Sequence, residues 1–240
     1  MLWGLFKKVA VADTAAIVSD AAFRDAGAHA GSELVLGVVC FAIQIYADFS
    51  GYSDIAIGTA RLFGIRLSQN FATPYFSRDI AEFWRRWHIS LSTWFRDYLY
   101  VPLGGSRVDR GRVVRNVFVV FLVSGFWHGA NWTFIAWGAL HALYFVPQLL
   151  RGTNRRHLDL VARSRLLPSL REALQMTLTF ALVCVAWVLF RAESLTAALE
   201  YYAGIASPSL FSPPAEFAYV VPIAILFVSE WLQRGKEHAL

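Results

Sequence analysis

Two histidines in strongly apolar, aromatic surroundings are the residues of this sequence best suited to chemistry. His88 stands in the run FWRRWHISLSTWF and His128 in SGFWHGANWTF, each directly after a tryptophan. No Asp, Glu, Lys or Arg occurs between Arg115 and Arg151. Such a run is long enough to enter a bilayer and return as a hairpin, with its turn near 125–131. His128 would then lie at membrane depth, where an ionisable group is costly and a functional role is the default interpretation.

The segment around His88 has the pattern of a helix that lies in a membrane interface. Plotted at about 100° per residue, residues 82–100 separate into two faces, and only Ile89 is out of place. The apolar arc holds Phe83, Trp84, Trp87, Leu91, Trp94, Phe95, Tyr98 and Leu99, and the polar face holds Glu82, Arg85, Arg86, Ser90, Thr93, Arg96 and Asp97. Rings at the acyl boundary and cations toward the headgroups are what such a helix needs. We therefore predict a re-entrant or interfacial amphipathic helix with His88 at the edge of its apolar arc.

Polar residues interrupt the first long apolar stretch. The apolar span 33–47 is followed by DFSGYSD, which cannot face lipid, and a second short span is predicted at 55–65. Two interpretations stay open for Asp48, Tyr52 and Asp54. They form a polar cluster between helices, with Ser and Gly allowing close packing, or they shape a reaction chamber and orient a catalytic histidine.

Four segments taken together resemble one protein family. They are DFSGYSDIAIG (48–58), FWRRWHISLSTWFRDYLYVPLGG (83–105), SGFWHGANWTFIAWG (124–138) and WVLFRAESLTAAL (187–199). They are similar to the membrane-bound O-acyltransferase family, in the branch of the bacterial alginate O-acetyltransferases and their relatives, which include the teichoic acid D-alanine transfer protein. The resemblance implies an all-α, polytopic transmembrane protein with re-entrant or interfacial amphipathic helices.

The resemblance also implies roles for the histidines and their neighbours. His128 matches the family's catalytic histidine in the motif that begins at Trp127, and we expect it to be the general base that removes the proton of a hydroxyl nucleophile. An apolar surround keeps an imidazole neutral, and a dry site limits hydrolysis of the acyl donor. His88 matches the second polar position that is characteristic of the family. It is expected to orient substrate or polarise the acyl carbonyl. Asn131 either donates a hydrogen bond to the base or the oxyanion, or packs.

The remaining histidines and both cysteines receive no chemical role. We expect His141 to be structural, and the others to be surface residues: His29, His157 and His238. Cys40 and Cys184 lie inside apolar runs and are expected to be buried. No metal site is expected, because the histidines lack accompanying ligand spacing, and a serine hydrolase is not expected, because GxSxG is absent.

Composition and charge support a membrane protein over a soluble one. Hydrophobic residues make up 57% and charged residues 16%, the mean hydropathy is +0.46, and soluble domains carry about 25% charged residues. The net charge of +5 comes from arginines that lie between apolar spans, which indicates topology rather than nucleic-acid binding. Lys7 and Lys8, in a partly apolar helix at 1–25, are expected to snorkel to one surface.

The basic loops predict the orientation of the spans. Further spans are expected at 117–127, 132–150, 173–190 and 217–229. The segments 107–115 and 151–171 and the C-terminal tail are rich in arginine or lysine, whereas the loop 191–216 is acidic. By the positive-inside rule the first three are cytoplasmic and that loop is external. The hairpin tip with His128 would point outward.

The expected activity is transfer of an acyl group, acetyl in the first instance, to hydroxyls of an extracytoplasmic polysaccharide such as alginate. The resemblance places the protein in the bacterial cytoplasmic (inner) membrane. It implies no bound cofactor, a co-substrate donor such as acetyl-CoA or an acyl-carrier thioester, a glycan acceptor, and other envelope O-acetylation proteins as partners. Teichoic acid and peptidoglycan are alternative acceptors, and a non-catalytic transporter or scaffold half is the rival.

The start of the sequence resembles an internal part of longer proteins. GLFKKVAVAD is similar to a segment near the middle of full-length family members, which carry further spans upstream. We therefore interpret residues 1–240 as a single transmembrane domain that corresponds to a C-terminal half, with an N-terminal half as a possible partner.

Overall fold

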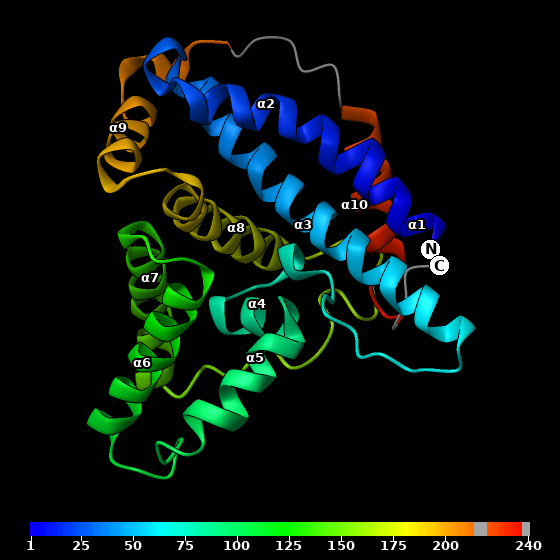
Figure 1. Ribbon diagram of the computed structural model, residues 1–240, viewed down its shortest axis with the longest axis vertical. Helices are drawn as coiled ribbons and strands as arrows, with labels where there is room; N and C mark the ends of the chain where they lie inside the picture. The colour runs from blue at the N-terminus through cyan, green and yellow to red at the C-terminus, as the bar shows by residue number, and fades with distance from the viewer. Residues whose placement is uncertain (214–219, 237–240) are drawn as a thin grey trace. The chain divides into compact units, whose positions relative to one another are not determined.

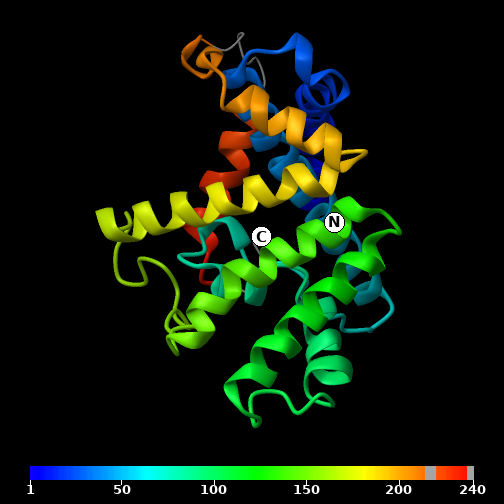
Figure 2. The ribbon, with the colours of Figure 1, turned by 90° about the vertical axis from the view of Figure 1, so that its left-hand side faces the viewer.

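The computed structural model describes residues 1–213 and 220–236, and these described residues form helices and connecting segments without a β-strand (Figures 1 and 2). The all-α prediction is confirmed. Contacts divide the chain into two compact units, one made of 1–69 with 191–240 and the other of 70–190. The prediction of a single domain over the whole chain stays a prediction.

The first unit begins with a long helical run that packs along another helix. The run consists of α1 (Leu2–Leu5), a π-helical segment (Phe6–Ala12) and α2 (Asp13–Arg24). It lies beside α3 (Gly31–Leu62) (Figure 1). A Cβ atom at Gly4 would collide with the carbonyl oxygen of Gly51. Small residues therefore let the two backbones approach closely, as the sequence predicted for the serine and glycine of this segment.

The expected break in the first apolar stretch is wrong. α3 continues without interruption through residues 48–54. It can do so because Asp48 pairs with Lys8 at 2.8 Å, and Asp54 pairs with Lys7 at 3.0 Å. Ion pairing to the neighbouring helical run removes the need for an irregular polar segment between two short spans.

Lys7 does not snorkel, so that prediction is also wrong. Its side chain is only 5% exposed and also reaches the carboxylate of Glu230 at 3.4 Å. Glu230 lies on α10 (Val220–Gln233) and accepts a hydrogen bond of 2.6 Å from the Tyr46 hydroxyl. A buried charge needs an opposite charge nearby, and here two carboxylates supply it.

The acidic loop predicted at 191–216 is partly helical. It contains α9 (Leu195–Ile205) and a short 3₁₀ turn at Pro208–Phe211, and a further 3₁₀ turn lies at Ala26–Ala28. The hydroxyl of Tyr201 donates to the carbonyl of Leu34 at 2.7 Å, which holds α9 against α3. Glu216, the start of the span expected at 217–229, and His238 lie outside the described residues.

The second unit opens with short helices, and the single amphipathic helix expected at 82–100 is wrong. A 3₁₀ turn (Pro74–Phe76), α4 (Ile80–Arg86), α5 (Ile89–Phe95) and a π-helical turn (Arg96–Tyr100) follow one another. The helix breaks at Trp87 and His88, and His88 has a left-handed φ of 43°. Trp94 and Tyr98 of the expected apolar arc are exposed, while Glu82 of the expected polar face is buried.

The predicted hairpin is confirmed. α6 (Arg110–His128) and α7 (Trp132–Leu150) run side by side and are joined by a turn at 129–131 (Figures 1 and 2). A Cβ atom at Gly125 would collide with the carbonyl of Phe134, and one at Gly138 with the carbonyl of Phe121. These two glycines let the helices approach closely enough for the hairpin to close.

Three described helices are long and apolar enough to cross a membrane: α3, α7 and α8 (Leu170–Arg191). The expected spans at 132–150 and 173–190 correspond to the last two. α6 is not among them, because its first turns carry arginines at 110, 112 and 115. α10 is apolar but shorter. Cys40 and Cys184 are buried and unpaired, as expected.

Candidate active site

His128 is the last residue of α6, and aromatic rings surround it. Its ring centroid lies 5.0 Å from that of Trp127, 5.3 Å from Trp137, 5.1 Å from Phe190 and 6.4 Å from Phe134. These rings come from α6, α7 and α8, and the imidazole is half-buried among them. The apolar surround expected from the sequence is present, and such a surround favours the neutral form of an imidazole.

The turn after His128 is fixed by Asn131. This residue is the N-cap of α7, and its Oδ1 accepts a hydrogen bond of 3.2 Å from the backbone N–H of Thr133. The cap satisfies one of the orphan donors at the start of the helix. A further role of Asn131 toward the base or an oxyanion stays a prediction. Trp127 and its neighbours Phe126 and Trp132 are exposed at the tip, a pattern typical of a membrane interface.

His88 lies at the break between α4 and α5. It is the N-cap of α5, in a left-handed conformation that non-glycine residues rarely adopt. The next residue, Ile89, donates its N–H to the carbonyl of Asn70 at 2.9 Å, which supports the break. The imidazole stacks on Phe71 at 6.4 Å. Burial lowers the pKa of His88 to about 4, so this imidazole is neutral at pH 7.

An electrostatic interaction couples the two candidate histidines, His88 and His128. A positive charge on His88 disfavours one on His128. The two residues are 40 positions apart in the sequence, and the second unit contains both. The sequence assigned both histidines to one site, and that assignment stays a prediction.

The acidic and tyrosine residues of α3 lie in the other unit. Asp48 and Asp54 hold Lys8 and Lys7 in ion pairs, and Tyr52 is 68% exposed. The interhelix polar cluster that the sequence left open is therefore present. A role of these three residues in shaping a reaction chamber or orienting a histidine stays a prediction.

The other histidines differ in their surroundings. His141 is completely buried in α7, and its Nδ1 accepts a hydrogen bond of 3.2 Å from Nε1 of Trp84. His29 is partly exposed and pairs with Glu33 at 3.3 Å. His157 was expected at the surface, but its side chain is only 14% exposed and lies 3.8 Å from Asp79, so that expectation is wrong.

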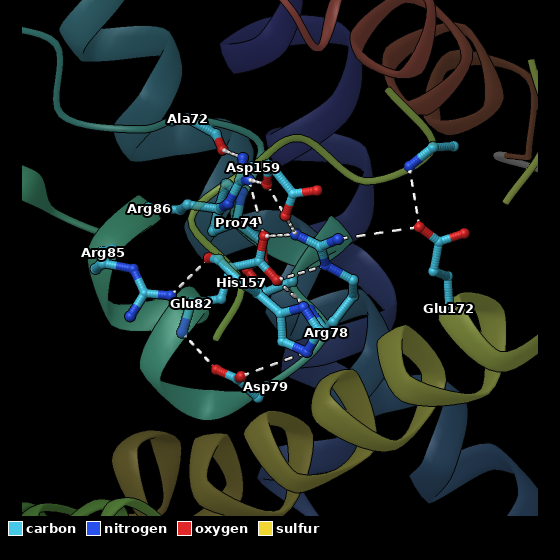
Figure 3. A network of polar contacts seen from close by, with 12 residues as sticks. Ala72, Pro74, Arg78, Asp79, Glu82, Arg85, Arg86, His157, Asp159 and Glu172 are labelled. Atoms are coloured by element: carbon cyan, nitrogen blue, oxygen red, sulfur yellow. Dashed lines mark hydrogen bonds and ion pairs between the residues drawn. The ribbon is translucent and has the colours of Figure 1, made fainter. Parts of the chain in front are cut away.

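Sequence reasoning missed a buried charge network at the start of the second unit (Figure 3). Arg78 binds Glu82 through Nε and Nη2, both at 3.1 Å, and Arg86 reaches the same carboxylate at 2.8 Å. Nη2 of Arg78 also donates to the carbonyl of Asp159 at 2.7 Å. The network therefore ties α4 to the loop before α8. Its signal in the sequence was the spacing of four between Arg78, Glu82 and Arg86.

This arrangement suits proton transfer. Each imidazole is half-buried against aromatic rings, and the described residues contain no cluster of three or more His, Cys, Asp or Glu side chains placed to hold a metal ion. A half-buried neutral imidazole can accept a proton from a bound hydroxyl group, and the second imidazole can hold or polarise the other reactant.

Comparison with known proteins shows the family of the chain. Residues 30–189 match the model of MBOAT, the membrane-bound O-acyltransferase family. A "Probable alginate O-acetylase AlgI" of Pseudomonas aeruginosa is 44% identical over 199 residues, which are 83% of this chain and 36% of the relative. A "Peptidoglycan O-acetyltransferase" of Helicobacter pylori is 42% identical over 204 residues, 84% of this chain and 37% of the relative.

A more distant relative covers less of the chain. A "Teichoic acid D-alanyltransferase" of Streptococcus thermophilus is 40% identical over 119 residues, 46% of this chain. The chain spans little more than a third of the length of the alginate and peptidoglycan relatives. His88, His128 and the whole hairpin fall inside the matched residues 30–189. The chain, a multi-span α-helical membrane protein, therefore belongs to the membrane-bound O-acyltransferase family.

Proposed function

We propose that this chain is part of an O-acyltransferase that moves an acetyl group from a thioester donor to hydroxyls of an extracytoplasmic polysaccharide, with His128 as the general base. The observation that carries the proposal is the position of His128. It ends α6 at the tip of the hairpin and lies within an aromatic surround. Removing a proton from a sugar hydroxyl requires such a group.

In the proposed reaction His128 takes the proton of the glycan hydroxyl as its oxygen attacks the thioester carbonyl. The new C–O bond forms, the C–S bond breaks, and the departing thiolate receives the proton from the imidazolium. His88, whose imidazole stacks on Phe71 at the helix break, orients the acyl group or polarises its carbonyl. The rings of Trp137, Phe134 and Phe190 limit water at the reacting atoms, which protects the donor from hydrolysis.

Alginate is the first acceptor that we propose, and peptidoglycan is the second. The alginate and peptidoglycan relatives are similar to this chain to nearly the same degree, at 44% and 42% identity. The donor would be acetyl-CoA or an acyl-carrier thioester, bound as a co-substrate. We place the protein in the bacterial cytoplasmic membrane, where it would work with other envelope O-acetylation proteins.

The proposal is tested by measuring glycan-bound acetate in cells that produce this chain together with any coding sequence upstream of it. His128→Ala is expected to lower the acetylation rate by roughly 10²–10⁴-fold at an unchanged amount of protein in the membrane. His29→Ala is the matched control, because His29 lies in the other unit and pairs only locally with Glu33.

Two results would overturn parts of the proposal. Acetylation close to wild type in His128→Ala would exclude His128 as the base, and it would favour the rival in which the buried histidines line a conduit. Acetate found on peptidoglycan and not on alginate would correct the acceptor.

A further inference from the structure

Two polar contacts between described residues join α4, the helix before His88, to the hairpin that carries His128, and one of them runs from the N–H of Ala81 to Oε1 of Gln148 at 3.2 Å. The other is made by two side chains. The indole Nε1 of Trp84, on α4, donates to Nδ1 of His141, on α7. Resting on the proposed function, we propose that His141 is a positioning residue: by holding Trp84 it fixes the separation of His88 and His128 at the value that acyl transfer requires.

The hydrogen bond determines the protonation of His141. An indole N–H can only donate, so Nδ1 must act as the acceptor and carries no proton. In the neutral imidazole the proton is then on Nε2. The Nε2 atom is buried and has no hydrogen-bond partner among the described residues. His141 therefore uses its acceptor for Trp84 and leaves its donor unused.

Trp84 is well placed to transmit this constraint. Its ring packs against Phe121 of α6 at 5.3 Å and against Trp137 of α7 at 5.8 Å, so it contacts both helices of the hairpin. Trp137 in turn packs against His128 at 5.3 Å. Trp84 is four residues before His88, at the last full turn before the helix break. Movement of Trp84 would therefore displace His88 relative to His128.

Packing alone does not explain a histidine at position 141. The ring lies among Phe83, Phe121, Trp137 and Tyr144, where a phenylalanine would fill nearly the same volume. Burying an unpaired N–H donor carries a desolvation cost that an apolar ring would avoid. What a phenylalanine lacks is the acceptor for Trp84. The directional bond to α4 is thus the property that distinguishes histidine at this position.

Two substitutions of His141 separate its acceptor from its volume. His141→Asn keeps an acceptor, Oδ1, near the place of Nδ1 and loses ring volume, whereas His141→Phe keeps the ring and loses the acceptor. We expect kcat per folded molecule to remain close to wild type in the Asn variant. In the Phe variant it should fall by about 10- to 100-fold, since a displacement of about 1 Å can cost that much. Trp84→Phe should match the Phe variant, and the double variant should be no worse.

The opposite ranking would overturn the proposal. Retained kcat in His141→Phe with a loss in His141→Asn would show that only volume matters. Loss of kcat in both variants would show that the imidazole acts chemically and not through Trp84.

A readout without catalysis keeps this test independent of the proposed function. The rates at which diethyl pyrocarbonate modifies His88 and His128 in membranes, measured by mass spectrometry, should rise in His141→Phe and stay unchanged in His141→Asn. If the wild-type chain transfers no acetyl group and this pattern still holds, the acyltransferase proposal fails while the positioning role of His141 stands. Equal reactivity in all variants would reject the positioning role itself.

Discussion

Two regions of the second unit differ in whether their buried polar groups have hydrogen-bond partners. In the network around Arg78, each buried charge faces an opposite charge or a carbonyl at hydrogen-bond distance. In the aromatic cluster around His128 and His141, the polar atoms are imidazole and indole nitrogens, and Nε2 of His141 and Nε1 of Trp137 have no hydrogen-bond partner among the described residues. The Arg78 network holds segments of the chain together, whereas the aromatic cluster contains one histidine, His128, that is only half-buried and can meet a substrate.

The first unit repeats the paired arrangement with other residues. Lys7 lies between Asp54 and Glu230, on three segments far apart in the sequence. A buried ion pair adds little stability compared with apolar packing, but removing one partner is expensive because the other charge is left buried. Substitutions in the paired regions should therefore reduce stability, whereas substitutions in the histidine cluster should reduce activity.

Glu82→Ala should have the largest effect on stability. It removes the carboxylate that binds both Arg78 and Arg86, and it leaves the Arg78 guanidinium buried without its bidentate partner. We expect the free energy of unfolding to fall by about 3–5 kcal/mol, measured in detergent micelles by thermal or denaturant unfolding.

The control for Glu82→Ala is Asp97→Ala, which removes a carboxylate from an exposed pair with Arg96. An exposed pair contributes little to stability, so this variant should unfold like the wild type. A loss of similar size in both variants would contradict the distinction between the buried and exposed pairs.

Lys7→Met should have the next largest effect on stability. It also tests whether the first unit takes part in the chemistry. It leaves the Glu230 carboxylate buried against Tyr46 without a cation, while Asp54 is partly exposed and can be hydrated. We expect a loss of about 3 kcal/mol, at the lower end for a broken buried pair. Acetylation per folded molecule should not change. A fall in kcat without a fall in stability would show that the first unit takes part in the chemistry.

The sequence predicted the parts of this structure that depend on local pattern. The uncharged run between Arg115 and Arg151 predicted the α6–α7 hairpin and its turn, since only a hairpin can place such a run in a bilayer and return it. The same run and the matched motif selected His128. The fold class followed from composition and the resemblance.

The sequence could not predict features that depend on partners distant in the chain. The helical wheel placed Glu82 toward solvent because periodicity carries no information about the loop at Asp159, which binds the Arg78 that pairs with Glu82. Lys7 was assigned to a surface because its partner Glu230 lies more than 200 positions away. The break at His88 was missed because it depends on a backbone contact with Asn70, which no periodic pattern reveals.

Asn131→Ala should have the smallest effect on stability. Compared with Asn131→Ser, it tests whether this residue only caps α7 or also contacts the reacting atoms. As an N-cap of α7 it accepts one hydrogen bond, from Thr133 N–H, and its loss should cost about 1 kcal/mol. Asn131→Ser restores an acceptor at the cap without the amide donor. If capping is the whole role, Ser recovers both stability and kcat. If the amide also stabilises an oxyanion, Ser recovers stability but leaves kcat lowered, by up to roughly 10²–10³-fold for a lost oxyanion donor. Asn131 would then act on the reacting atoms, as His128 and His88 are proposed to do.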